Sequence, residues 1–524
     1  MSAPFPVAVI QAALDAGVRE FVVCAGARNS ALVVVLAAAG ESVRLWQHFE
    51  ERAASFFAIG RIRATGKPVA VVTTSGTAAA ELLPAIIEAH YQGLPLLALT
   101  ADRPASYRGS GAPQAIEQEN LFGLYALCID VEECPVNLTD WNRETPLHLN
   151  ACLSEPDSEA LAALRIAAAS LRFRPVHTQD TPPFEMHSTG PAEHLLLAGE
   201  LLDDEIAAVA AFAAQGCLVD AEAASGLREE LALQDKLIRC GDATLRHLPV
   251  KQVFRFGGVP SGRYWRDLED RSDIKVINRS RSGYAGLARK EGVIQMPDTY
   301  LLSPSGESLD RFMARDAALA QRLDALLAKR PSSEPGLIRL LSGRIPNQAT
   351  VFTGNSLAVR EWNLCAAWGR GHRVHVLRGA NGIDGNLSAF LGLAADKPDA
   401  WCITGDLTAL YDLAAPWMLS QLPVGRRQFV VIQNGGGRIF SRLPSLRGLT
   451  DRERSLMENP HEIGLKHWAA MWDMDHVSGG PEILQNAGTL ESLADHAVIE
   501  LYPDAAETEI FWQEWREAEK EIWR

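Results

Sequence analysis

The chain has 524 residues, and its 50 lysines and arginines against 65 aspartates and glutamates give a net charge of −15. This length predicts three or four domains with ample core, and the ordinary composition excludes a disordered, fibrous or disulfide-scaffold protein. The negative balance argues against nucleic acid or an anionic membrane as the main partner. A small anionic substrate stays open, because local charge can oppose the total.

The sequence gives no signal for a membrane or secreted location. No apolar run approaches the ~18 residues that span a bilayer. No Lys or Arg precedes Arg19, so a secretory signal peptide is not expected. Eight cysteines without a C-x-x-C pair predict buried thiols in a reducing cytoplasm, with neither a zinc site nor a disulfide framework; they stand at positions 24, 128, 134, 152, 217, 240, 365 and 402.

Short apolar runs that end in Gly, Ser or Asn turns and lead into amphipathic stretches predict an α/β fold of three doubly wound parallel-sheet domains. The expected strands are 21–24, 68–73, 94–100, 195–198, 217–220, 252–256, 275–278, 401–404 and 428–432. Helices are expected to end near Tyr91 and Ser420.

Two polar, proline-containing stretches, 174–191 and 330–335, are typical of linkers. They divide the chain into predicted domains 1–180, 190–330 and 336–524. Parallel sheets bind ligands where the carboxyl ends of strands meet helix N-termini. Functional residues are therefore expected in the loops that follow the strands.

Gly405-Asp406 and Asn434-Gly435-Gly436 each follow a predicted strand, with 28 residues from Asp406 to Asn434. Viewed singly, Asp406 is a helix N-cap and Asn434-Gly435 is a turn. Together they place a carboxylate, an amide oxygen and an exposed carbonyl on adjacent strand ends, a hard-oxygen set suited to Mg²⁺ bound to a diphosphate. This layout resembles the diphosphate-binding motif of thiamine diphosphate enzymes.

Glu51 lies in the segment WQHFEERAASFFAIG. Viewed alone, it is a solvated glutamate in the first turn of a helix. The apolar residues after it favour a buried helix instead, in which a carboxyl group has a raised pKa. The following TSGTAAAELLPAIIEA resembles the pyrimidine-binding domain of thiamine diphosphate enzymes, where a glutamate shares a proton with N1′ of the cofactor.

Six further motifs, in order over nearly the whole chain, resemble the 2-succinyl-5-enolpyruvyl-6-hydroxy-3-cyclohexene-1-carboxylate synthase family of menaquinone biosynthesis. They are TADRP (100–104), GAPQAI (111–116), GNSLAVR (354–360), RGANGIDG (378–385), GDLTALYDL (405–413) and GGRIFSRLP (436–444). The resemblance is strong in the first and last thirds and weak in the middle. It implies a pyrimidine-binding domain, a middle domain and a diphosphate-binding domain.

The family resemblance also implies a transferase reaction in two halves. Thiamine diphosphate-dependent decarboxylation of 2-oxoglutarate is followed by 1,4-addition of the resulting succinyl-semialdehyde carbanion equivalent to isochorismate. A homodimer or homotetramer in the cytoplasm, with active sites at the subunit interface, is implied as well.

Both substrates are dicarboxylates, so the site must supply several fixed cations. The substrate residues that the resemblance implies are Arg28, Arg103, Gln114, Arg263, Ser356, Arg360, Arg378 and Phe440, with Glu51, Arg28, Gln114, Ser356, Arg360 and Arg378 as the catalytic set. The cofactor residues are Glu51, Asp406, Asn434, Gly436, Ile439 and Phe440, and the Mg²⁺ or Mn²⁺ ligands are Asp406, Asn434 and Gly436. Any one of the arginines, viewed singly, is as well explained by a surface salt bridge.

Two departures from the family pattern affect the substrate contacts. The first turn reads AGARNS, so Ala27 replaces the hydroxyl expected there, and the hydrogen bond of that hydroxyl is either lost or supplied by Asn29 or Ser30. Arg263 stands where lysine is frequent in the family.

Three alternatives stay open. They are another 2-oxoacid-dependent thiamine diphosphate decarboxylase or carboligase of the acetolactate synthase type, a nucleotide-binding dehydrogenase, and a catalytically silent α/β module. The arginine set argues against the first, and the lack of G-x-G-x-x-G after a strand argues against the second. A silent module should have lost Glu51 or Asp406, and both are present.

The net charge is unevenly distributed along the sequence. Residues 421–450 contain five arginines and no acid, whereas residues 491–524 contain ten acids and three bases. This pattern predicts a basic patch around the proposed diphosphate and dicarboxylate site.

Overall fold

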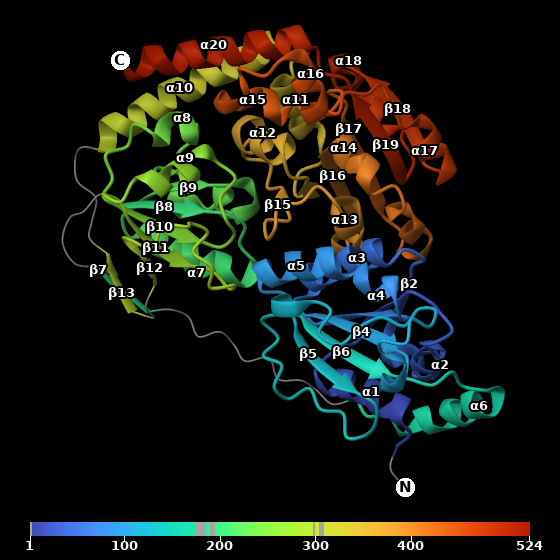
Figure 1. The fold of residues 1–524 in the computed structure, drawn as a ribbon. Helices are drawn as coiled ribbons and strands as arrows, with labels where there is room; N and C mark the ends of the chain where they lie inside the picture. Colours follow the sequence, from blue (N-terminus) through green and yellow to red (C-terminus); the bar gives the residue numbers. More distant parts are fainter. Residues whose placement is uncertain (1–2, 174–184, 189–193, 297–298, 303–308) are drawn as a thin grey trace. The chain divides into compact units, whose positions relative to one another are not determined.

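The computed structural model describes residues 3–173, 185–188, 194–296, 299–302 and 309–524. The chain forms two compact units, drawn in Figure 1. The first comprises Met1–Thr181, Gly379–Lys397 and Asp412–Val424, and the second comprises Pro182–Arg378, Pro398–Tyr411 and Gly425–Arg524. Most of the predicted linker 174–191 lies outside the described residues.

A six-stranded parallel sheet, in the order β2-β1-β3-β4-β6-β5, forms the core of the first unit. Its strands are β1 (Glu20–Val23), β2 (Arg44–Gln47), β3 (Val69–Thr73), β4 (Leu96–Asp102), β5 (Leu127–Val131) and β6 (Leu147–Cys152). The helices of this unit are α1 (Phe5–Asp15), α2 (Ser30–Ala38), α3 (Glu51–Thr65), α4 (Thr77–Ala80), α5 (Leu83–Gln92), α6 (Ser158–Ala167) and α13 (Asn386–Ala394). The central strands are buried on both faces, which is why they appear in the sequence as continuous apolar runs.

Helices α3 and α13 pack closely in the first unit because each has a glycine at the contact. A Cβ on Gly60 would lie 2.1 Å from the carbonyl oxygen of Ala389, and one on Gly392 would lie 2.1 Å from that of Phe57. Arg61, 1% exposed, pairs with Glu20 and Asp396 beside this contact.

The second unit contains a five-stranded parallel sheet in the order β12-β11-β10-β8-β9. Its strands are β8 (His194–Ala198), β9 (Cys217–Ala221), β10 (Gln252–Phe256), β11 (Lys275–Arg279) and β12 (Val293–Gln295). Strands β7 (Glu185–Ser188) and β13 (Thr299–Leu302) form a separate parallel pair. The accompanying helices are α7 (Asp203–Ala214), α8 (Asp242–Leu245), α9 (Arg263–Asp267) and α10 (Leu309–Lys329).

A further six-stranded parallel sheet of the second unit has the order β15-β14-β16-β17-β19-β18. We call it the third sheet; its strands are β14 (Thr350–Thr353), β15 (Arg373–His375), β16 (Asp399–Gly405), β17 (Arg426–Ile432), β18 (Asp475–Gly479) and β19 (His496–Leu501). Its helices are α11 (Glu334–Arg344), α12 (Leu357–Cys365), α14 (Asp406–Tyr411), α15 (Ile439–Arg442), α16 (Asp451–Glu458), α17 (Lys466–Met471), α18 (Pro481–Gln485), α19 (Ala487–Glu491) and α20 (Ala505–Trp523). In Figure 1, α20 runs beside α10.

The structure confirms the predicted fold of three parallel α/β sheets and all nine predicted strands, with shifts at their ends. The helix expected to end near Tyr91 is two helices, α4 and α5, because Pro84 begins a new helix. The helix expected to end near Ser420 likewise divides into α14 and a 3₁₀ segment, Ala415–Gln421, that starts beside Pro416.

The prediction of a linker at 330–335 is wrong. Helix α10 ends at Lys329 and α11 begins at Glu334, so only a short turn separates two packed helices. Ser333, Glu334 and Pro335 are buried in that turn and at the start of α11.

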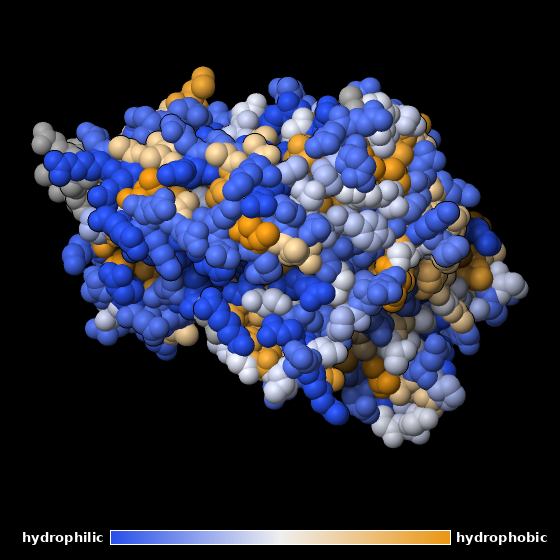
Figure 2. All heavy atoms as spheres, turned by 90° about the horizontal axis from the view of Figure 1, so that it is seen from above, coloured by the Kyte–Doolittle hydropathy of each residue, from blue (hydrophilic) through white to orange (hydrophobic). Residues whose placement is uncertain are grey.

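No helix among the described residues is long and apolar enough to cross a membrane. On the face drawn in Figure 2, hydrophobic residues occur in small groups among hydrophilic ones. All eight cysteines are free; six are buried, Cys128 is half-buried and Cys134 is exposed.

Candidate active site

The predicted site residues of the second unit follow four neighbouring strands of the third sheet. Arg378 follows β15, Ser356 follows β14, Asp406 follows β16, and Asn434 follows β17. Because all the strands are parallel, these loops lie along one edge of the sheet, where ligands bind in such folds. The structure therefore brings these four residues to a single edge.

Asp406 joins two of these loops. It is 2% exposed, and its Oδ2 accepts hydrogen bonds from the N–H groups of Gly435 and Gly436 at 2.8 and 2.9 Å. Its Oδ1 accepts from the N–H of Leu407 at 2.7 Å, and Nε2 of His461 lies 3.5 Å from Oδ2. Asp406 therefore does more than cap a helix, because it fixes the loop that carries Asn434.

The Asn434 side chain has one bonded end and one free end. Its Nδ2 donates to Oε1 of Glu334 at 3.0 Å. Its Oδ1 is buried and has no hydrogen-bond partner among the described residues. Buried polar atoms are nearly always satisfied, so this oxygen indicates a missing ligand.

Gly436 completes the predicted oxygen set. Its φ is 122°, and a Cβ there would lie 2.4 Å from the carbonyl oxygen of Glu458, so only glycine fits. With Asp406 and Asn434 it offers oxygen donors of the kind that Mg²⁺ or Mn²⁺ prefers. The described residues contain no cluster of three or more His, Cys, Asp or Glu that could hold a metal.

Ser356 and Gln114 both have a positive φ, which is uncommon for residues other than glycine. Ser356 precedes α12 with φ 69° and ψ −126°, and Gln114 has φ 59°. A Cβ on Gly76 would lie 3.3 Å from Cα of Gln114, so the loop of Gln114 packs closely on the turn after β3. Strain of about 1–3 kcal/mol at a non-glycine residue is typical of functional sites.

Two arginines at the edge of the third sheet have no ion pair with the described residues. Arg378, 7% exposed, donates to the carbonyl oxygens of Val259 and Pro260 and to Oδ1 of Asn355, each at 3.3 Å. Burial, together with the charge of Arg378, lowers the pKa of Arg360. Two neighbouring cations without carboxylate partners favour an anionic ligand.

The predicted site residues of the first unit also follow parallel strands, at the carboxyl edge of its sheet. Glu51 follows β2, Arg28 follows β1, and Arg103 follows β4, all at the carboxyl edge of the sheet. Arg28 donates to the carbonyl oxygen of Leu153 at 3.3 Å, and neither arginine forms an ion pair with the described residues. These residues and Gln114 belong to the first unit, and the other predicted site residues belong to the second.

Glu51 is the first residue of α3, and its neighbour caps the helix. Both carboxylate oxygens of Glu50 accept N–H groups, from Arg52 at 2.9 Å and from Ala53 at 3.0 Å. Glu51 is thus not needed as a cap. Burial raises the pKa of Glu51, and the charges of Glu50 and Glu81 raise it further.

The remaining predicted residues are less enclosed. Arg263 is exposed at the start of α9 and pairs with Asp267 at 2.7 Å. Ile439 and Phe440 are half-buried in α15, after the Gly436 turn.

The side chain of Asn29 is not free to make the hydrogen bond that the hydroxyl missing at Ala27 would have made. Its Nδ2 donates to the carbonyl oxygen of Cys24 at 2.8 Å, and its Oδ1 accepts from the N–H of Gly26 at 2.9 Å. Both ends of the amide therefore hold the turn itself.

The predicted basic patch is wrong. Arg426 and Arg427 lie at the amino end of β17, opposite Asn434, and Arg427 is fully buried. Arg438 pairs with Glu458 at 2.8 Å, and Arg442 pairs with Glu509 of the acidic C-terminal region at 2.7 Å. Charges counted along the sequence are separated or neutralised in space.

The sequence interpretation missed two buried acids beside the site. Glu334 on α11 and Glu361 on α12 are 3% and 1% exposed. Glu334 lies inside the predicted linker. Ser333 followed by Pro335 is a signal for the start of α11, but it does not reveal the contact of Glu334 with the site.

In the five-stranded sheet of the second unit, the loops that follow β8 and β10 pack directly on one another. A Cβ on Gly199, after β8, would lie 2.1 Å from the carbonyl oxygen of Gly258, after β10. One on Gly257 would lie 2.2 Å from that of Glu200. Glycine is therefore required at both positions, because a side chain at either one would collide with the backbone of the facing loop.

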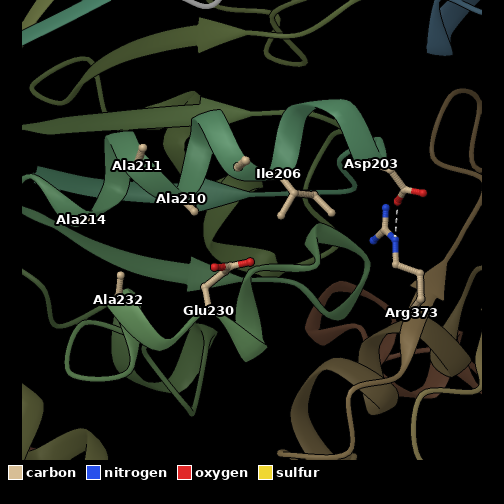
Figure 3. Close-up of a pocket in the computed structure, with 9 residues that line it drawn as sticks. Asp203, Ile206, Ala210, Ala211, Ala214, Glu230, Ala232 and Arg373 are labelled. Atoms are coloured by element: carbon tan, nitrogen blue, oxygen red, sulfur yellow. Dashed lines mark hydrogen bonds and ion pairs between the residues drawn. The ribbon is translucent and has the colours of Figure 1, made fainter.

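A cavity of about 510 Å³ beside α7 is separate from these residues. Figure 3 shows the alanine face of α7 (Ala210, Ala211 and Ala214), with the ion pair of Asp203 and Arg373 at one end. None of the predicted site residues lines it.

Comparisons with known proteins agree with these observations. Residues 7–121 match the family model described as "Thiamine pyrophosphate enzyme, N-terminal TPP binding domain". A 2-succinyl-5-enolpyruvyl-6-hydroxy-3-cyclohexene-1-carboxylate synthase of Akkermansia muciniphila is 41% identical, with 94% of this chain and 95% of the relative covered. Proteins of the same name from Bdellovibrio bacteriovorus and a Synechococcus species are 39% and 33% identical, with 97% and 85% of each chain covered.

Proposed function

The chain belongs to the 2-succinyl-5-enolpyruvyl-6-hydroxy-3-cyclohexene-1-carboxylate synthase family, and from this membership we propose that it joins 2-oxoglutarate to isochorismate with loss of carbon dioxide. The bond from C1 to C2 of 2-oxoglutarate breaks and releases carbon dioxide. C2 then bonds to the isochorismate ring in a 1,4-addition, a step of menaquinone biosynthesis. Identity over nearly the full length of named relatives carries this proposal.

Thiamine diphosphate, when bound, supplies the electron sink for both halves of the reaction. We propose that Glu51 exchanges a proton with N1′ of the cofactor, a role that its raised pKa and lack of an ion pair among the described residues support. Ile439 supports the cofactor rings, and Phe440 lines the pocket.

The proposed cation, Mg²⁺ or Mn²⁺, is held by Asp406, by Oδ1 of Asn434 and by the carbonyl oxygen of Gly436. The unpartnered Oδ1 of Asn434 is the observation that supports this set. With the cation bound, these residues would hold the diphosphate, and the N-terminus of α14 lies at the same edge of the sheet.

We propose that the carboxylates of the substrates are bound by Arg28, Arg103, Arg360 and Arg378, with Gln114 and Ser356. These arginines form no ion pair with the described residues, and Gln114 and Ser356 have strained backbones. Arg263 is the weakest member of the proposed set, because its guanidinium pairs with Asp267.

The proposed domains are 1–180 for pyrimidine binding, 190–330 for the middle domain and 336–524 for diphosphate binding; each range contains one of the three sheets of five or six strands. The proposed assembly is a cytoplasmic homodimer or homotetramer. Each active site then combines the pyrimidine-binding domain of one subunit with the diphosphate-binding domain of another.

The deciding experiment supplies thiamine diphosphate, Mg²⁺ and 2-oxoglutarate, with and without isochorismate, and identifies the products. We expect one carbon dioxide released for each isochorismate consumed. Carbon dioxide and succinic semialdehyde without consumption of isochorismate would identify a simple decarboxylase instead. Turnover of pyruvate in preference to 2-oxoglutarate would identify an acetolactate synthase-like enzyme.

A further inference from the structure

The N-terminus of α11 carries a buried carboxylate that the proposed reaction does not use. Glu334 is 3% exposed, and its Oε1 accepts the Nδ2–H of Asn434, 100 residues later in the chain. We propose that Glu334 is a positioning residue, which holds the Asn434 amide so that Oδ1 faces the divalent cation. This inference rests on the metal site proposed above.

The backbone of Glu334 is fixed from two sides. Its N–H donates to Oγ1 of Thr508 at 3.0 Å. Ser333 caps the helix, with its Oγ accepting the N–H of Gly336 at 3.1 Å. A carboxylate on so rigid a support has a defined position relative to the loop that follows β17.

The chemistry of the two side chains explains the orientation. The two ends of an asparagine amide are similar in shape but opposite in hydrogen bonding, since one donates and the other accepts. Oε1 of Glu334 accepts this hydrogen bond, so the NH₂ end of Asn434 faces Glu334. Turning the amide would bring two acceptors together and bury the donors without a partner. The end that remains free is Oδ1, the atom without a partner in the structure.

A second buried acid, Glu361 on α12, lies close to Glu334. It is 1% exposed, and burial together with the neighbouring Glu334 raises the pKa of Glu361 well above its usual range. Glu361 is therefore a second buried acid beside Glu334, and it lies on the helix that carries the proposed substrate residue Arg360.

Substitutions of Glu334 in the full-length protein test the proposal. E334L and E334A both remove the acceptor, and two variants are made because the leucine fills the space that the alanine leaves empty. Mn²⁺ affinity is measured by electron paramagnetic resonance in the presence of thiamine diphosphate and without substrate. We expect a loss of about 10- to 100-fold in Mn²⁺ affinity, the range typical for residues that orient a metal ligand.

Two comparisons separate positioning from a structural role. E334Q retains Oε1 as an acceptor and should restore Mn²⁺ affinity to within a few-fold of wild type. On an N434A background, E334L should cause no further loss, because a residue that acts through Asn434 has nothing left to orient. Additive losses, or an E334Q variant as weak as E334L, would overturn the proposal.

D406A distinguishes the inference from the function on which it rests. If D406A loses Mn²⁺ binding while E334L and E334A keep it, the role of Glu334 is wrong and the metal site stands. If D406A binds Mn²⁺ normally, the metal site itself is wrong.

Discussion

Nη1 of Arg360 donates a hydrogen bond to the carbonyl oxygen of Ser356, 2.5 Å away and one helical turn earlier. Ser356 has φ 69° and ψ −126°, so the start of α12 combines a strained serine with an arginine that forms no ion pair with the described residues. Such strain persists only where the surrounding structure imposes it. The strain and the hydroxyl of Ser356 can be separated by two substitutions.

S356G should stabilise the fold and impair the enzyme. Glycine adopts this conformation at little cost, so the free energy of unfolding should rise by about 1 kcal/mol. The hydroxyl is lost, so kcat/KM for 2-oxoglutarate should fall. Thermal unfolding and steady-state kinetics measure the two effects.

S356A is the matched control, because it removes the hydroxyl and keeps the strain. It should lose as much activity as S356G without gaining stability. Wild-type activity in both variants would show that the hydroxyl of Ser356 does not contact the substrate.

R378A should weaken the use of dicarboxylates. A charge-assisted hydrogen bond contributes about 1.5–3 kcal/mol, so kcat/KM for 2-oxoglutarate should fall by about 10- to 150-fold. R271A is a suitable control, because Arg271 is exposed and pairs with Asp273 at 2.8 Å. A loss of the same size in both variants would mean that the effect comes from the lower net positive charge of the protein rather than from a contact between Arg378 and the substrate.

E51Q should fold and bind thiamine diphosphate but be nearly inactive. The uncharged amide cannot exchange a proton with N1′, and the loss of general acid–base catalysis typically costs about 10²- to 10⁴-fold in rate. Because Glu50 caps α3, the helix should keep its stability. Calorimetric titration with thiamine diphosphate checks binding, and activity close to wild type would exclude the proposed role of Glu51.

The residues that the sequence reveals most clearly are those that follow buried parallel strands. Asp406 and Asn434 could be predicted because the apolar runs before them have one structural explanation, and a parallel sheet brings its carboxyl ends to one edge. Glu334 could not be placed in this way. It reaches Asn434 from a helix 100 residues away, and such a contact depends on packing between elements rather than on a local pattern.

The same limit explains the mistaken basic patch. Five arginines within thirty residues appear as one cluster in the sequence, but β17 carries two of them at its amino end, away from the site. The charge of Arg442 is balanced by Glu509 from α20. A count of charges along a segment predicts a charged surface patch only if the segment keeps those residues on one side of the molecule. The charges must also remain free of ion pairs with other parts of the chain.

Mixed subunits test the proposed assembly. Glu51 belongs to the first compact unit and Asp406 to the second, so each half of the proposed site can be inactivated separately. E51Q and D406A proteins should each be nearly inactive alone. If each active site combines domains of two subunits, a heterodimer has one doubly defective site and one intact site.

Random reassociation of equal amounts of the two variants should therefore restore about a quarter of wild-type activity, because about half the dimers are mixed and each has one intact site. If each chain instead built its own site, every site in the mixture would carry one substitution, and no activity would return. The double variant E51Q/D406A mixed with wild type is the control. Its heterodimers would combine one defect in each site, so activity should fall below that of the wild-type protein added. Activity that merely reflects the amount of wild type would show that sites do not form between subunits.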